Sequence, residues 1–176
     1  MLSFRQHVVK RCANPGAREG WGCEGVGMGV RAVTLEDWRE FWPLVEGFGT
    51  AFSEAESRGF FAELVGDPRW VVLGYDDGGL VGYAAVQDYG THLRGGARHH
   101  GRLHDLYVIP ERRGAGIGRA LMDGAVEWAS IRVRYLEWQA HHERSAPFYE
   151  ALGYHGQPCP QPDYPTFEID FKASAG

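Results

Sequence analysis

A glycine-rich loop is the segment of this sequence whose residue types and spacing point most directly to ligand chemistry. It reads Arg113-Gly114-Ala115-Gly116-Ile117-Gly118 and lies between a β-rich segment and a helical one. Spaced glycines let the backbone approach a ligand closely. The first amides of a helix have no acceptor inside the helix and carry the positive end of its dipole. Such a terminus binds phosphate groups, and Arg113 and Arg119 would add positive charge.

Two common phosphate-binding patterns do not fit this loop. The dinucleotide pattern needs Gly-x-Gly-x-x-Gly, whereas the spacing here is Gly-x-Gly-x-Gly, and the chain has no Gly-x-x-x-x-Gly-Lys-Ser/Thr segment. A Gly-x-Gly turn can also do no more than connect two elements. The strand before the loop and the helix start after it therefore carry the prediction of a phosphate site.

Hydrophobic patterning predicts the elements that position the loop. A strand over 103–109 ends at Pro110, and a helix over 117–130 and a strand over 133–138 follow, which predicts a parallel strand–helix–strand unit. The remaining expected elements are a strand at 30–33, a helix capped by Thr34 and kinked or shortened at Pro43, a helix capped by Ser53, a hairpin of 70–75 and 80–86, a polar loop at 89–101, a helix at 145–152 and a strand at 165–171. This order predicts an α/β fold with a mixed, mostly antiparallel β-sheet flanked by helices.

Length and composition restrict the class of protein. A chain of 176 residues with 44% hydrophobic residues fits one globular domain, which we place at 28–176, with 1–27 as a flexible leader or extended start. A net charge of −5 without a Lys/Arg-rich run argues against a nucleic-acid partner. No apolar run approaches the roughly 20 residues of a membrane span. Three scattered cysteines favour reduced thiols and a cytoplasmic location.

Two segments together resemble the GNAT superfamily of N-acetyltransferases. Residues 105–121 are similar to the acetyl-CoA signature of that family, whose pattern of Gln or Arg, two residues, Gly, one residue, and Gly or Ala is met by Arg113, Gly116 and Gly118. Residues 145–154, Ser-Ala-Pro-Phe-Tyr-Glu-Ala-Leu-Gly-Tyr, look like a second family segment built around a Phe-Tyr pair. The resemblance covers the chain from about Met28 onward and implies a GNAT-like splayed sheet with a central β-α-β cofactor unit.

The resemblance implies a set of residues that bind acetyl-CoA as co-substrate. The backbone of Tyr107 and Val108 would hydrogen-bond the pantetheine arm, and the amides of the loop would hold the pyrophosphate. The residues concerned in the loop are Arg113, Gly114, Ala115, Gly116, Ile117, Gly118 and Arg119. Where the family usually has Asn and Ala near the cofactor, this chain has His142 and Ser145, which the resemblance places near the same cofactor path.

The resemblance also implies catalytic groups for acetyl transfer, which needs a base for the amine and a proton for the departing thiolate. Tyr149 matches the family's general acid, and a phenol with an ordinary pKa of about 10 is protonated at neutral pH; the alternative is that Tyr149 only packs in its helix. For the base, residues 104–108 resemble the Glu-Asp-Leu-Tyr-Val strand of the spermidine/spermine (diamine) branch. There a Glu is assigned to base chemistry, and His104 stands in its place here.

The identity of the base stays open between two residues. His104 would act directly or through water, because its ordinary pKa of about 6.5 lets it accept a proton near neutrality; a purely structural His104 is the alternative. Glu137 is the second candidate. Asp105 has the opposite strand parity, so we expect it to face away from His104, either as a structural residue or to neutralise a cationic substrate. Five further histidines suggest no metal site, because adjacent ones diverge: His92, His99, His100, His141 and His142.

These observations predict an acyltransferase that moves an acetyl group from acetyl-CoA to a primary amine of a small molecule, directly and in a ternary complex. The alternatives are a protein or peptide N-acetyltransferase and a non-catalytic acyl-CoA-binding sensor. We expect no metal, no nucleic acid and no membrane partner. A homodimer is compatible with the resemblance, because dimers are common in that family. The aromatic residues Trp38, Trp42, Phe60 and Phe61 are expected in the core more than in a pocket.

Overall fold

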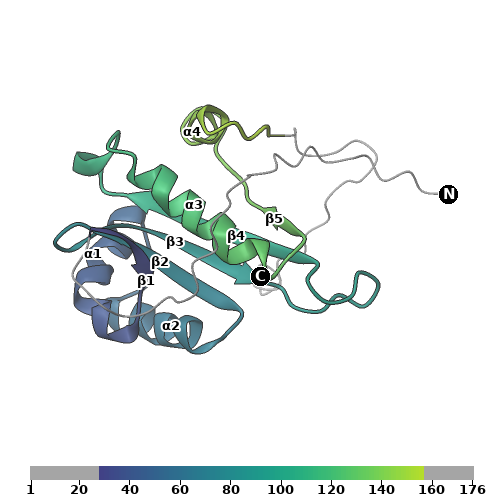
Figure 1. The fold of residues 1–176 in the computed structure, drawn as a ribbon. Helices are drawn as coiled ribbons and strands as arrows, with labels where there is room; N and C mark the ends of the chain where they lie inside the picture. Colours follow the sequence, from purple (N-terminus) through teal and green to yellow (C-terminus); the bar gives the residue numbers. More distant parts are fainter. Residues whose placement is uncertain (1–27, 157–176) are drawn as a thin grey trace, which may run out of the picture.

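A computed structural model describes residues 28–156 of the chain. One β-sheet lies between two helical layers, with α3 across one face and α1 and α2 against the other (Figure 1). The elements are β1 Gly29–Ala32, a 3-10 turn Leu35–Asp37, α1 Trp38–Phe48, α2 Glu54–Gly66, β2 Trp70–Asp76, β3 Leu80–Asp88, β4 His100–Val108, a 3-10 turn Pro110–Arg112, α3 Ile117–Ser130, β5 Tyr135–Glu137 and α4 Ala146–Ala151. The expected leader at 1–27 and the expected strand at 165–171 lie outside the described residues.

The sheet has the order β1-β2-β3-β4-β5 within the described part of the chain. Its first three pairs are antiparallel, and β4 pairs with β5 in parallel. The prediction of a mixed, mostly antiparallel sheet with a parallel strand–helix–strand unit is therefore confirmed. No helix in residues 28–156 is both long enough and apolar enough to span a lipid bilayer.

The face that carries α1 and α2 is packed with aromatic rings. Ser53 begins α2 through a reciprocal cap, in which the Glu56 amide donates to its hydroxyl and Glu56 Oε2 accepts from the Ser53 amide. Trp38 and Phe41 of α1 pack against Phe61 of α2, with ring centroids 5.4 and 4.7 Å from it. These contacts join the two helices, and Phe41 also meets Tyr83 of β3 edge to face, which ties the layer to the sheet.

The opposite face is covered by α3. Leu121 and Met122 are fully buried there against the strands. A Cβ atom at Gly124 would lie 3.1 Å from Val30 and 3.2 Å from Leu73, so this glycine lets the helix approach the sheet closely. The helix that follows the glycine-rich loop is thus held firmly by the core.

Several boundaries differ from the expectations. The chain makes a 3-10 turn after Thr34 before α1 begins, and Pro43 lies inside a continuous α1, on its exposed side, rather than ending it. Strand β4 begins at His100, three residues earlier than expected, because the polar segment 100–102 pairs with β5. Strand β5 has only three residues. Short strands of this kind depend on pairing with a neighbour, which hydrophobic patterning does not report.

Candidate active site

The sheet opens between β4 and β5, and the site is built around that opening. Pairing between the two strands covers only His100–Tyr135, Gly101–Leu136 and Arg102–Glu137. Beyond Arg102, β4 continues to Val108 with no strand on this side among the described residues. Backbone groups of an unpaired strand edge are available to an extended ligand.

The glycine-rich loop follows β4 and turns directly into α3. Gly114 and Gly116 have φ angles of +81° and +83°, which other residues adopt at a cost. Space in front of both is open, since no heavy atom lies within 4 Å of a Cβ built at either position. The first helical hydrogen bond runs from the Ala120 amide to the Gly116 carbonyl, so the amides of 117–119 have no acceptor within the helix. This geometry suits a phosphate group.

Gly118 allows two helices, α3 and α4, to pack closely. A Cβ atom there would lie 3.1 Å from the ring of Phe148 in α4. The absence of a side chain at Gly118 therefore lets α4 dock against the first turn of α3. This contact joins the loop to the second segment of the sequence resemblance, in which Tyr149 is the residue after Phe148.

The basic residues of the loop have different partners. Arg113 donates from Nε to the Val108 carbonyl at 3.0 Å, and its guanidinium lies 5.8 Å from the Tyr107 ring centroid. Arg112 forms an ion pair with Asp77 of the β2–β3 turn. Both side chains fasten the loop to the sheet. Arg119 is exposed on the first turn of α3, and its charge remains the one best placed to meet an anion there.

Tyr107 and Val108 lie at the open edge, with side chains on opposite faces of the sheet. The Tyr107 ring packs against Phe48 with centroids 5.6 Å apart. Because the Val108 carbonyl already accepts from Arg113, the edge groups left for a pantetheine arm are those around Tyr107.

Tyr149 lies in α4 and packs its ring on Trp138, with centroids 5.3 Å apart. Its hydroxyl forms no hydrogen bond with any described residue. Burial raises the pKa of Tyr149, so the phenol keeps its proton to a higher pH than an ordinary tyrosine. A protonated hydroxyl without a partner in residues 28–156 suits a proton donor.

His142 and Ser145 lie in the turn before α4. His142 is highly exposed, stacks on His141, and has Nε2 3.5 Å from Glu143 Oε1. Ser145 Oγ accepts from the His141 amide at 2.9 Å, which closes the turn. The Ser145 hydroxyl thus has a structural bond, and neither side chain is directed toward a ligand by its contacts.

The expectation that His104 and Asp105 face opposite sides is wrong. Pairing between β3 and β4 shifts from Ala85–Asp105 to Val86–Leu103, which leaves His104 unpaired in a β-bulge. The extra residue cancels the alternation, so both side chains come to the α1/α2 face. The sequence carries no glycine or proline that marks this bulge.

His104 is anchored at the bulge. Its ring stacks on Trp70 with centroids 4.7 Å apart, and Nε2 lies 2.9 Å from Gln87 Oε1. Desolvation by these neighbours lowers the pKa of His104, and the charge of Arg102 lowers it further. Glu137 is exposed and lies opposite Arg102 in the last β4–β5 pair, at the point where the strands separate.

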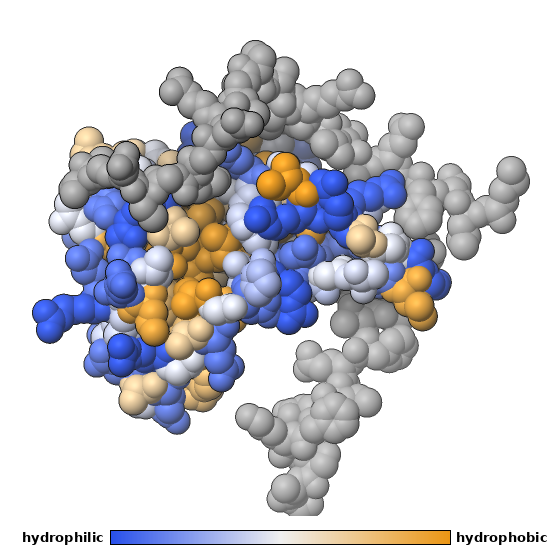
Figure 2. All heavy atoms as spheres, turned by 60° about the horizontal axis from the view of Figure 1, so that its bottom comes forward, coloured by the Kyte–Doolittle hydropathy of each residue, from blue (hydrophilic) through white to orange (hydrophobic). Residues whose placement is uncertain are grey.

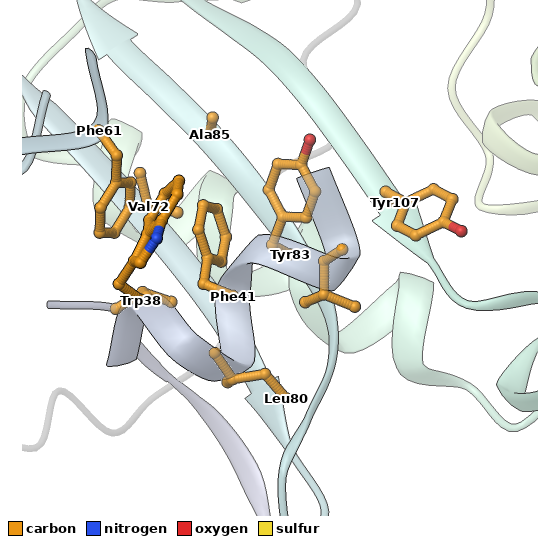
Figure 3. Packing of buried hydrophobic residues seen from close by; sticks show 10 residues of the cluster. Trp38, Phe41, Phe61, Val72, Leu80, Tyr83, Ala85 and Tyr107 are labelled. Carbon is orange, nitrogen blue, oxygen red and sulfur yellow. The ribbon is translucent and has the colours of Figure 1, made fainter. Parts of the chain in front are cut away.

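A pocket of about 160 Å³ lies on the same face, between the two helices and the sheet. Figure 2 shows hydrophobic atoms gathered on this side of the molecule, and Figure 3 shows Phe61, Trp38, Phe41 and Tyr83 close together above the strands. The residues that line this pocket are Trp38, Phe41, Val45, Thr50, Phe52, Ser57, Phe60, Phe61, Leu64, Val72, Tyr83, Ala85 and Asp105. Of the aromatics expected in the core, Trp38 and Phe61 are buried and also line the pocket, and Trp42 is half-buried against the core. The expectation is wrong for Phe60, which is exposed and lines the pocket. Sequence reasoning missed Tyr83 and Ser57.

The histidines singled out in the sequence form ring contacts. His99 lies 4.8 Å from His92 and 4.2 Å from His100, measured between ring centroids. Within residues 28–156, no three His, Cys, Asp or Glu side chains are grouped to hold a metal ion.

Comparison with known proteins agrees with this geometry. The model of the acetyltransferase (GNAT) family matches residues 32–154. A glucosamine 6-phosphate N-acetyltransferase of Trypanosoma brucei brucei is 38% identical over 77 residues, which is 44% of this chain and 52% of that protein. The match thus spans about half the length of this curated relative.

Solved structures share the fold. An acetyltransferase of Trypanosoma brucei superposes with a TM-score of 0.63 at 25% identity, covering 82% of this chain and 99% of that one. AAC(6')-Iy, solved with the bisubstrate analogue CoA-S-monomethyl-acetylneamine, gives a TM-score of 0.68 at 15% identity, with 82% and 98% covered. With a family model matched over most of its length, on the segments that form the open edge, the loop and α4, the chain belongs to the acetyltransferase (GNAT) family.

Proposed function

We propose that this chain transfers an acetyl group from acetyl-CoA to the primary amine of a small molecule, by direct attack in a ternary complex. The observation that carries the proposal is the junction of β4 and α3. There an unpaired strand edge leads into a loop whose two positive-φ glycines face open space before the free amides of a helix. Membership of the GNAT family supports acetyl-CoA as the donor.

The residues present fit this donor. The amides of 114–119 would bind the pyrophosphate, with Arg119 adding charge, and the β4 edge around Tyr107 would bind the pantetheine arm as an added strand does. Acetyl-CoA supplies an activated thioester carbonyl. The protein would hold that carbonyl near the bulge in β4, remove a proton from the amine and donate a proton to the departing thiolate.

Three side chains are candidates for the proton transfers of this reaction. An alkylammonium substrate loses one proton to His104, with Glu137 as the second candidate for this role, directly or through water. The nitrogen lone pair then forms the C–N bond, the C–S bond breaks, and Tyr149 protonates the leaving sulfur. The nitrogen loses its second proton as the amide forms, which restores Tyr149, so the reaction releases coenzyme A and one net proton.

His104 gives this scheme a pH dependence. In the tautomer that donates from Nε2 to Gln87, Nδ1 carries the free lone pair. A general base must be unprotonated before it can accept a proton from the substrate. Because the pKa of His104 is lowered, its ring stays neutral to a more acidic pH than an ordinary histidine. We expect the acid limb of kcat/KM for the enzyme to lie below pH 6.5, the ordinary value.

In His104→Gln this limb should disappear and kcat/KM at neutral pH should fall by roughly 10²-fold or more. Gln keeps a polar side chain at the bulge, and Glu137→Gln is the parallel variant. If the limb persists in His104→Gln and is lost in Glu137→Gln, the base is Glu137.

The proposed function is tested by measuring coenzyme A release with a panel of small amines, peptides with free N-termini, and no acceptor. Turnover with one or more small amines supports the proposal. Turnover with peptides alone would assign the chain to peptide acetylation. Acetyl-CoA binding without turnover on any acceptor would make it an acyl-CoA-binding module. Glucosamine 6-phosphate belongs in the panel, because a relative named for that substrate is 38% identical over the matched segment.

A further inference from the structure

The pocket on the α1/α2 face contains a charge that nothing in the described structure neutralises. Asp105 extends into it from β4, and no side chain of residues 28–156 donates a hydrogen bond or forms an ion pair to its carboxylate. Burial raises the pKa of Asp105, as expected for a carboxylate placed among apolar groups without a counter-ion. Its charge in turn adds to the burial that raises the pKa of Tyr83. A partly buried, unpaired carboxylate in a pocket is a site for a cation.

The rest of the pocket is apolar or neutral. Asp105 is the one charged residue among the described residues that line it, and Lys, Arg and His are absent from that described lining. A second polar atom, Ser57 Oγ, is buried and has no hydrogen-bond partner among the described residues. A phosphorylated sugar would find no cation here for its phosphate and a carboxylate that repels it.

The volume of the pocket limits the size of the molecule that it can bind. About 160 Å³ of space lies between aromatic rings that are tied to one another, because Phe41 stacks on Phe61 and meets Tyr83 edge to face at 5.0 Å. Apolar cavities of roughly 150 Å³ hold one benzene-sized ring. A ring in this position would complete the row of aromatic contacts seen in Figure 3.

We propose that this pocket binds the acceptor, and that the acceptor is a primary ammonium carried on an apolar body about the size of one aromatic ring, with Asp105 as the ion-pair partner of the ammonium. This inference rests on the proposed acetyl transfer and names its substrate class. Asp105 is one residue from the bulge and two residues from Tyr107 on the same strand. The nitrogen it holds therefore lies next to His104 and to the edge assigned to the donor.

The experiment uses the full chain with acetyl-CoA and three amines: 2-phenylethylamine, spermidine and glucosamine 6-phosphate. The wild type should give its highest kcat/KM with 2-phenylethylamine. Asp105→Asn keeps the shape of the side chain and removes its charge, and it should raise the KM for 2-phenylethylamine by roughly 10- to 150-fold, the span of a charge-assisted hydrogen bond. Asp123→Asn, exposed on α3, is the matched control and should leave that KM unchanged.

A neutral ligand separates a charge effect from damage to the pocket. 2-Phenylethanol has the same ring and chain without the ammonium, so its inhibition constant should be the same for the wild type and Asp105→Asn. The inference is overturned if both ligands weaken together, or if glucosamine 6-phosphate or spermidine is the preferred substrate and Asp105→Asn leaves its KM unchanged. Either result leaves the acetyltransferase assignment intact. That assignment fails separately, when acetyl-CoA binds and no amine releases coenzyme A.

Discussion

Replacing Tyr149 by Phe is expected to lower kcat by roughly 10²- to 10⁴-fold, the usual worth of a positioned general acid. Phe keeps the ring that packs on Trp138 and removes only the hydroxyl, which no described residue hydrogen-bonds. The loss should therefore appear in kcat at saturating acetyl-CoA and amine, while the Kd for acetyl-CoA and the thermal midpoint stay near those of the wild type. The raised pKa of Tyr149 means that its acid form persists across the neutral range.

Tyr154→Phe is the control for this variant. Tyr154 also packs on Trp138, with centroids 5.1 Å apart, but it lies beyond the end of α4 and has no assigned role in the chemistry. Its kcat should remain close to that of the wild type. Equal kcat values for Tyr149→Phe and the wild type, on an amine that the enzyme turns over, would remove Tyr149 from the mechanism and leave it as a packing residue of α4.

Gly116→Glu is expected to weaken acetyl-CoA binding by roughly 10- to 1,000-fold. The new carboxylate would stand at the amides assigned to the pyrophosphate, and two like charges about 4 Å apart repel by about 1–4 kcal/mol between the dielectric limits of water and a protein surface. The φ angle of +83° adds strain for any residue with a Cβ. Isothermal titration with acetyl-CoA measures the effect directly and needs no knowledge of the acceptor.

Gly116→Asn separates the two causes, because Asn tolerates the left-handed conformation and carries no charge. It should retain most of the affinity. Ala115→Glu places the same charge one residue earlier in the same exposed loop, at a position without a positive φ, and should weaken acetyl-CoA binding through charge repulsion alone. If Gly116→Glu bound acetyl-CoA as the wild type does, the pyrophosphate could not lie on this loop.

Much of the fold was predictable from the sequence because its signals are local. The apolar period of α1 and α3, the Ser53 cap and the Asp76–Gly79 turn each depend on residues within a few positions of one another. The glycine-rich loop belongs to the same kind of signal, because a positive φ and a free helix start are properties of adjacent residues. Strand β5 and the start of β4 were placed less well, because their polar residues become strand only by pairing with each other.

Local residue patterns thus predicted the loop, the helix behind it and the family resemblance of the two segments around Gly116 and Tyr149. The rest of the candidate site depends on contacts between segments that are distant in the chain. The bulge at His104 arises from the register between β3 and β4, and it brings Asp105 to the same face as His104 against the expectation from alternation. The pocket exists because Phe61 of α2 meets Phe41 of α1 over the sheet. Strand register and helix packing depend on many contacts between residues far apart in the chain. A short window of sequence therefore does not predict them.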